Sequence, residues 1–195
     1  MLDKGERIDP RIVRTRALLQ DAFIQLLGEK SFDELTVQDI TARATVNRAT
    51  FYAHFPDKYA LLDEMIRSGF AQHLQRRLDA PAESTEALLR QLLLAVTDHL
   101  SAIASSCQRS LQTFEAAIEA RIKQQLRAEV RGWLAEQPGL RRLPARRLDV
   151  VATLLSWSIY GAALEWLKQG DRQSGEAFAD EVVPLLAVTV TAASA

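Results

Sequence analysis

The fold is decided by residues 35–62, which read LTVQDITARATVNRATFYAHFPDKYALL. Thr36 can cap a first helix, because Asp39 stands three residues later, as in a capping box. Asn47 can cap a second short helix, which Pro56 ends by biasing the residue before it away from helical geometry. Two short helices joined by about three residues have the spacing of a helix-turn-helix, whose second helix lies in the major groove of DNA.

The second of these helices has two chemically different faces. Phe51 and Phe55, four residues apart, can pack inward against the first helix. Arg48 and Tyr52, also four residues apart, then face outward. A tyrosine hydroxyl can donate to phosphate, and an arginine in the first turn can contact a guanine edge through two hydrogen bonds. We therefore predict that this outward face binds DNA.

Around this stretch the sequence predicts helices throughout. An upstream helix begins at Pro10, and no segment alternates with the period of two that a strand requires. We predict an all-α protein of about nine helices, with a three-helix domain over residues 1–56 and a helical bundle over residues 57–195. The expected later helices run over about 57–78, 84–103, 113–136, 145–169 and 174–191, with a bend or short helix near 105–110.

Composition narrows the class of protein. The 195 residues are 48% hydrophobic, enough to bury a core, and the formal net charge is −1. Residues 1–58 hold nine cationic and nine acidic residues, so charge alone does not argue for nucleic acid. Cys107, the single cysteine, excludes an internal disulfide. The first residues lack the apolar core of a signal peptide, and the apolar stretch 182–195 is too short to cross a membrane. We expect a cytoplasmic protein that does not contact membranes.

The run from Thr50 to Lys58, TFYAHFPDK, resembles the TetR family of transcriptional regulators. The other matching residues are LTVQDI at 35–40, Ala44, Val46, Leu61 and Leu62. The resemblance covers roughly residues 10–62. It implies a homodimer that binds palindromic operator DNA, usually as a repressor, and that a small-molecule effector releases from the DNA.

The family's pattern also implies which residues contact DNA. The residues expected at backbone phosphates are Thr36, Tyr52, His54 and Lys58. Those expected at or near bases are Arg48, Ala49 and Thr50, and Asn47 is also expected in the DNA-binding surface. A phosphate partner would also offset the unfavourable position of the Lys58 cation at the start of a helix.

Two further features bear on this surface. Thr45 occupies the link position that usually holds glycine in the family, and a β-branched residue is poorly suited to positive φ, so we expect an altered turn and helix tilt. Upstream, Arg14 shares one helical face with Arg7 and Arg11, beside Lys4 in a polar arm. We predict that Arg14 contacts phosphates; a solvated helix face is the alternative.

The last two helices are more apolar than a single inward face requires. Small residues among them would let another helix approach closely, as in a dimer interface built as a four-helix bundle. The alternative is a pair of core helices in a monomer. The predicted interface residues are Leu154, Trp157, Ser158, Gly161, Ala162, Val182 and Leu186.

We expect an effector site between the helix at 57–78 and the middle helices, where aromatic or polar residues stand on otherwise apolar helices. A small molecule that binds one state more tightly would shift the dimer to a spacing that no longer fits DNA. The alternative is that most of these residues belong to the core. The candidates are Met65, Phe70, His73, His99, Phe114, Trp133, Trp157 and Tyr160.

Nothing in the sequence supports catalysis or a bound metal. No nucleophile–base arrangement or phosphate-binding glycine loop occurs, and His73, His99 and Cys107 lack the close spacing of a zinc site. We therefore expect no enzyme activity, cofactor or metal. Two other functions stay open: a helical adaptor that recruits a protein partner through its apolar C-terminal face, and a DNA-binding regulator that senses redox state through Cys107.

Overall fold

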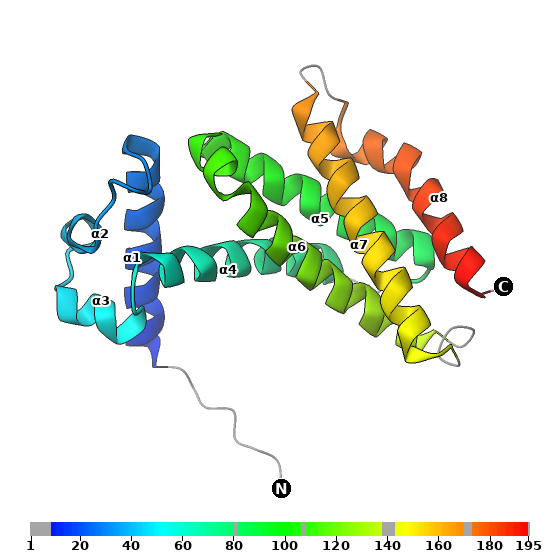
Figure 1. Ribbon diagram of the computed structural model, residues 1–195, viewed down its shortest axis with the longest axis horizontal. Coiled ribbons are helices and arrows are strands. Elements are labelled where there is room, and N and C mark those ends of the chain that lie inside the picture. The colour runs from blue at the N-terminus through cyan, green and yellow to red at the C-terminus, as the bar shows by residue number, and fades with distance from the viewer. Residues whose placement is uncertain (1–8, 80–81, 107, 138–142, 170–172, 195) are drawn as a thin grey trace, which may run out of the picture. The chain divides into compact units, whose positions relative to one another are not determined.

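A computed structural model describes residues 9–79, 82–106, 108–137, 143–169 and 173–194. Within these ranges the chain forms eight helices and no strand, which confirms the all-α prediction of about nine helices (Figure 1). The helices are α1 (Pro10–Glu29), α2 (Val37–Ala44), α3 (Arg48–His54), α4 (Lys58–Leu78), α5 (Thr85–Ser106), α6 (Gln108–Glu136), α7 (Ala145–Lys168) and α8 (Gly175–Ser194).

The difference from the expected helices lies between α5 and α6. α5 continues to Ser106 and α6 begins at Gln108, so the break between them falls within the stretch 105–110 where the sequence predicts a bend or short helix. A separate short helix does not occur there among the described residues. The five residues 108–112, QRSLQ, lack the apolar period of an amphipathic helix. They include Gln, Arg and Leu, whose high helix propensity favours continuation of α6 through this stretch. Cys107 itself lies outside the described residues.

The helices belong to two compact units, each described by itself. The first comprises Met1–Met65 with Ser106–Thr113, and the second comprises Ile66–Ser105 with Phe114–Ala195. α4 contributes its first eight residues, 58–65, to the first unit and its remainder to the second. The first unit extends beyond the predicted 1–56 domain, whose boundary stays a prediction.

In the first unit, α1 packs against both α2 and α3. Its buried residues include Phe23, which meets Phe32 edge-on at a ring-centroid distance of 6.1 Å. α2 and α3 bury Ile40 and Phe51 completely. A two-pronged ion pair also joins α1 and α2, because Arg43 donates to both carboxylate oxygens of Glu29 at 2.8 and 2.7 Å.

In the second unit, α5 is buried on nearly all sides, since the consecutive residues 92–97 are all buried. α7 and α8 form an antiparallel pair (Figure 1). At one end of this pair, the Trp166 indole stacks on Phe178 at 6.0 Å and donates to the Gln173 carbonyl at 2.9 Å. The second unit is therefore a helical bundle with α5 at its centre.

Two helical stretches pass a simple test for membrane spans. By length and composition alone, Thr85–Ser105 and Ala145–Lys168 could cross a membrane. However, 56% and 44% of their most apolar stretches are buried within the protein. Core helices of soluble proteins pass the same test, so it is weak evidence for a membrane span.

A pair of histidines lies inside the second unit. His99 of α5 is only 4% exposed, and its ring lies close to those of Phe70 and His73, at centroid distances of 5.6 and 5.3 Å. A Cβ added at Gly69 would lie 3.1 Å from His99 Cε1, so glycine there allows the close approach of α4. Burial, with a smaller contribution from His73, lowers the pKa of His99 to about 4. Burial also lowers the pKa of His73.

Protonation of His99 should make the free energy of unfolding depend on pH. Because the folded pKa of about 4 lies below the ordinary histidine value of 6.5, the unfolded chain binds protons more readily between these values. The part of the free energy of unfolding that depends on neutral His99 is fully present above pH 6.5 and is lost as pH falls towards 4. At about 1.4 kcal/mol per pKa unit, the loss amounts to about 3 kcal/mol. Urea denaturation at a series of pH values measures it.

Two variants test the assignment to this side chain. His99→Gln and His99→Leu both lack the titrating group but change the packing differently. Both should flatten the slope of stability against pH, whatever their absolute stability. A slope that stays as steep as in the wild type in both variants would mean that other groups cause it.

Candidate nucleic-acid interface

The start of α2 is held by the predicted capping box. The Asp39 amide donates to Thr36 Oγ1 at 3.2 Å, and the Thr36 amide donates to Asp39 Oδ2 at 2.8 Å. The Thr36 hydroxyl also donates to Asp39, so both donors of Thr36 are used. Lys30 lies 2.7 Å from the same carboxylate oxygen, and together Lys30 and Thr36 hold the pKa of Asp39 well below its usual range. Asp39 is thus a permanent anion at the helix start, where the dipole favours it.

The turn between α2 and α3 contains a residue in the left-handed region. Thr45 has φ 56° and ψ 42°, and it is the only non-glycine residue with positive φ in the part of the chain that the structure describes. Its amide donates to the Ala42 carbonyl, and the Val46 amide donates to the Thr41 carbonyl at 3.0 Å. The turn thus keeps the conformation that glycine would favour, and the β-branched residue carries the strain of it.

α3 begins at the predicted cap. Asn47 Oδ1 accepts from the Thr50 amide at 2.7 Å and from the Thr50 hydroxyl at 2.9 Å. Phe51 is fully buried and Phe55 is 2% exposed, which confirms the predicted inward pair. The inward pair therefore determines which side of α3 meets solvent.

The outward side of α3 carries Arg48, Ala49 and Tyr52, all exposed. An Arg48 guanidinium nitrogen lies 3.4 Å from the Tyr52 hydroxyl. The Tyr52 ring is edge-on to Phe51 at 5.6 Å, so the buried phenylalanine orients it. His54 is half-buried, with its ring 6.5 Å from that of Phe55. Arginine and tyrosine thus present adjacent donors on an exposed helical face.

Lys58 is engaged inside the first unit. Its ammonium donates to the main-chain carbonyls of Phe32, Asp33 and Leu35 at 2.8, 3.2 and 2.8 Å. It also lies 4.5 Å from the centre of the Phe32 ring. An ammonium group has three N–H donors, so these carbonyls use all of them. The favourable contacts also explain how a cation is accommodated at the start of α4, without a phosphate.

The cations of α1 divide into two groups. Arg11 and Arg14 are exposed. Arg16 turns inward instead, with its guanidinium 4.8 Å from the Phe55 ring centre and 3.7 Å from a Glu64 carboxylate oxygen. The other two predicted cations of the arm, Lys4 and Arg7, lie outside the described residues.

The predicted effector residues do not form one cluster. Phe70, His73 and His99 pack together, and no hydrogen-bond partner of His99 Nε2 occurs among the described residues. Trp157 and Tyr160 both lie near the Lys123 ammonium, at 4.0 and 5.4 Å from their ring centres. The remaining three are Met65 and Phe114, which are half-buried, and Trp133, which lines a groove between α4 and α6 together with Leu78 and Glu129.

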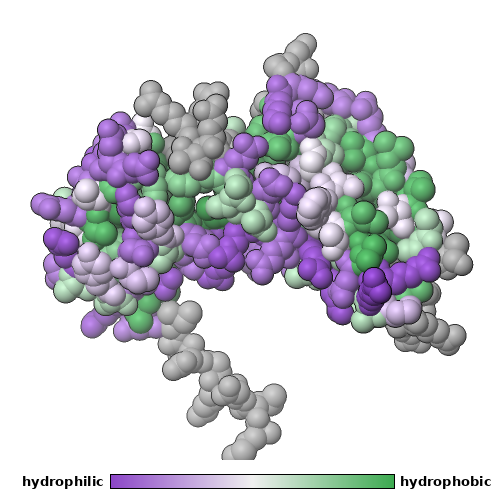
Figure 2. Space-filling view, viewed as in Figure 1, coloured by the Kyte–Doolittle hydropathy of each residue, from purple (hydrophilic) through white to green (hydrophobic). Residues whose placement is uncertain are grey.

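The predicted dimer residues fall on two sides of the α7–α8 pair. Leu154 and Trp157 are 53% and 61% exposed, whereas Leu186 is buried within the protomer. Leu186 shares the inward face of α8 with its near neighbours one turn away, so its exposed counterpart is Leu185, at 73%. Figure 2 shows apolar side chains gathered over α7 and α8. The exposed apolar residues here, which we call the α7–α8 strip, are Val150, Leu154, Trp157, Leu185 and Val188.

Comparison with known proteins points to one family. The sequence pattern described as "Bacterial regulatory proteins, tetR family" matches residues 19–65, which include α2 and α3. An uncharacterized HTH-type transcriptional regulator of Bacillus subtilis (strain 168), YxbF, is 36% identical over 104 residues, which make up 53% of this chain and 27% of that protein. The class D tetracycline repressor protein of Escherichia coli is 34% identical over 70 residues, 36% of this chain and 32% of that protein. The chain thus spans about a third or less of these relatives.

A solved structure resembles the chain over most of its length. The TetR transcriptional regulator from Streptococcus agalactiae 2603V matches with a TM-score of 0.57 at 23% identity, over 90% of this chain and 95% of the other. At that identity the likeness concerns the fold. It extends well beyond the residues of α1, α2 and α3 into the helices of the second unit.

Replacing Thr45 by glycine should stabilise the first unit. The left-handed conformation costs a residue with a Cβ about 1–2 kcal/mol, and the greater freedom of glycine in the unfolded chain returns part of that gain. We expect Thr45→Gly to raise the free energy of unfolding by about 0.5–1 kcal/mol in urea denaturation. Ala42→Gly is the matched control: Ala42 is exposed and lies in the last turn of α2, three residues before Thr45, and its replacement should lower stability by about 1 kcal/mol. Destabilisation by both variants would show that Thr45 is unstrained.

Proposed function

Because the chain belongs to the TetR family of bacterial regulatory proteins, we propose that it is a transcriptional regulator that binds operator DNA as a homodimer. The observation that carries this proposal is the exposed pair Arg48 and Tyr52, set on a helix whose opposite side is buried through Phe51. In a two-fold dimer, two such helices about 34–36 Å apart would enter successive major grooves of a palindromic site.

The proposed contacts differ in chemistry. Arg48 would donate to a base edge, with Ala49 and Thr50 close to the bases, and Tyr52 would donate to a backbone phosphate. His54 and Arg14 would contact phosphates at the edge of the same surface. Contacts from Thr36 or Lys58 would have to replace hydrogen bonds that these residues make within the protein, as would contacts from the cap Asn47. The proposal therefore depends on the contacts named before these, above all those of Arg48 and Tyr52.

Regulation by a small molecule is the second part of the proposal. The effector would bind within the second unit and favour a dimer geometry that does not fit DNA. The buried His99 Nε2, which has no partner among the described residues, supports a polar contact near Phe70 and His73. Repression is suggested by the name of the tetracycline repressor, to which the chain is similar. The redox alternative concerns Cys107, outside the described residues.

The DNA contacts can be tested on a duplex selected from a random-sequence library with the wild-type protein. Tyr52→Phe removes only the hydroxyl and should weaken binding to all sequences about threefold to tenfold, because one hydrogen bond is lost. Arg48→Ala should relax the preference at one base pair in each half-site, at about 1–3 kcal/mol of discrimination.

Tyr59→Phe is the matched control for the tyrosine. Tyr59 is also exposed and also packs edge-on against a phenylalanine, Phe32, at 5.1 Å, but it lies on α4. The variant Tyr59→Phe should leave DNA binding unchanged. Recovery of no preferred duplex, with no steep dependence of binding on salt concentration, would favour the adaptor function instead.

The homodimer is proposed to form through the α7–α8 strip. Exposed apolar patches of this kind mark interaction sites, and four helices from two copies can bury them together. Leu185→Glu should place a charge on this interface and give a monomer in sedimentation equilibrium at micromolar concentration. Ile24→Glu, which changes a 43% exposed residue of α1, should leave the dimer intact. A wild-type protein that sediments as a monomer would contradict the proposed interface.

A further inference from the structure

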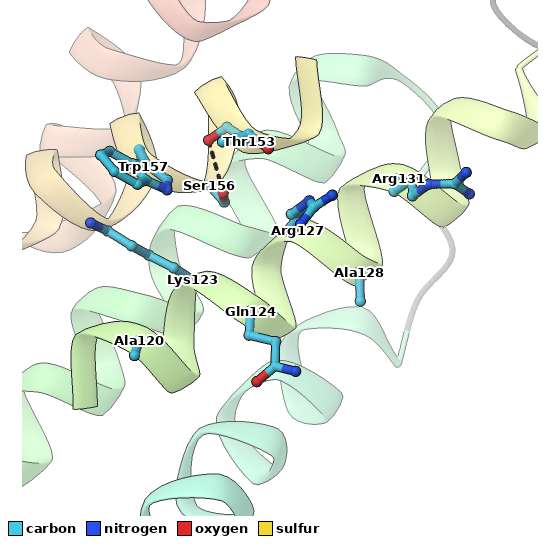
Figure 3. A pocket seen from close by; sticks show the side chains of 9 residues that line it. All are labelled: Ala120, Lys123, Gln124, Arg127, Ala128, Arg131, Thr153, Ser156 and Trp157. Atoms are coloured by element: carbon cyan, nitrogen blue, oxygen red, sulfur yellow. Dashed lines mark hydrogen bonds between the residues drawn. The ribbon is translucent and has the colours of Figure 1, made fainter. Parts of the chain in front are cut away.

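A groove of about 610 Å³ lies between α6 and α7 of the second unit. It is separate from the expected effector site between α4 and the middle helices, and of the eight predicted effector residues only Trp157 lines it. One wall carries Lys123, Arg127 and Arg131 of α6, and the other carries Thr153, Ser156 and Trp157 of α7 (Figure 3). Its volume is within the range of small-molecule sites.

The three cations form a row along one helical face, because they are spaced four residues apart. Arg131 is bonded to Asp149 at 2.6 Å, and Arg127 reaches the same carboxylate oxygen only at 3.7 Å. Lys123 pairs with Glu119 one turn earlier. Three cations therefore share two carboxylates, which leaves one positive charge in excess.

Arg127 is the cation with unused capacity. Its side chain is 51% exposed, and its distance to Asp149 exceeds that of a hydrogen bond. In Figure 3 its guanidinium points from α6 towards the wall formed by Thr153 and Ser156. A guanidinium with free donors can bind a carboxylate through two parallel hydrogen bonds.

The opposite wall offers a flat apolar surface and acceptors. Within one protomer Trp157 is 61% exposed although its ring lies 4.0 Å from the Lys123 ammonium, so the ammonium covers only part of it. Trp157 also belongs to the α7–α8 strip, so a ligand in the groove would lie at the edge of the proposed dimer interface. The Thr153 hydroxyl donates to the Asp149 carbonyl, and the Ser156 hydroxyl donates to the Thr153 carbonyl. Both hydroxyl hydrogens are used, so the oxygens can serve only as acceptors.

We propose that this groove binds an aromatic monocarboxylate. Arg127 pairs with the carboxylate, whose single charge balances the excess charge of the cation row. The aromatic body lies against Trp157, and a hydroxyl on the ring can donate to Thr153. The groove is a second site, additional to the effector contact proposed near Phe70 and His73, and only its role in regulation rests on the proposed function; the binding itself does not require DNA.

The test compares two probes of the same shape by titration calorimetry on the 195-residue protein without DNA. 2-Naphthoate carries the carboxylate, and 2-naphthamide is its uncharged counterpart. We expect the wild type to bind the carboxylate at least about tenfold more tightly than the amide. Arg127→Gln should reduce this ratio to about threefold or less, because the charge that distinguishes the probes is lost.

Arg146→Gln is the matched control, since Arg146 is an exposed arginine of α7 that does not line the groove, and it should keep the wild-type ratio. Trp157→Ala should weaken both probes by a similar factor. Equal binding of the two probes to the wild type, or an unchanged ratio in Arg127→Gln, would overturn the proposal, as would no saturable binding up to about 1 mM. Because DNA is absent, failure of DNA binding would leave these measurements unaffected.

Discussion

Burial of the Phe51 side chain is the constraint on which the first unit depends. α3 has seven residues, too few to be stable alone, so its position is set by packing. With Phe51 fully buried and Phe55 beside it, the helix has one possible rotation, and that rotation turns Arg48 and Tyr52 to solvent. The edge-on contact with the buried Phe51 ring then restricts the orientation of the exposed Tyr52 ring. The surface proposed for DNA is thus as rigid as the core beneath it.

Polar groups at the helix ends also help to fix the positions of α2 and α3. Each short helix starts at a side-chain cap, Thr36 for α2 and Asn47 for α3, and Lys58 satisfies three carbonyls of the connection before α2. Backbone N–H and C=O groups at a helix end that are buried without a hydrogen-bond partner destabilise the folded state. The caps and the Lys58 ammonium provide such partners here. The strained Thr45 is tolerated because both capped helices and the core hold the turn that contains it.

Sequence could predict what depends on local chemistry and helical period. The capping box, the cap of α3 and the inward phenylalanines follow from residue type and spacing, and the structure confirms them. It could not predict where long side chains end: Lys58 matches the family's pattern for a phosphate contact, yet its ammonium reaches the carbonyl of Phe32, 26 residues earlier in the chain. Nor could period decide between Leu185 and Leu186, since adjacent apolar residues leave the rotation of α8 open until its contacts with α7 are known.

Because sequence does not show where long charged side chains end, the net charge of this region does not indicate whether it binds DNA. Of the cations in residues 9–65, four are engaged within the first unit: Arg16 and Lys58 by aromatic rings, and Lys30 and Arg43 by carboxylates. This leaves Arg11, Arg14 and Arg48 exposed and without a carboxylate partner among the described residues, whereas three of the acids, Glu29, Asp39 and Glu64, are paired with Arg43, Lys30 and Arg16. Attraction to phosphate depends on the charges that remain accessible, because paired charges contribute little field at a distance. A domain with balanced charge can therefore still present a cationic face, and only the pairing inside the fold shows where that face lies.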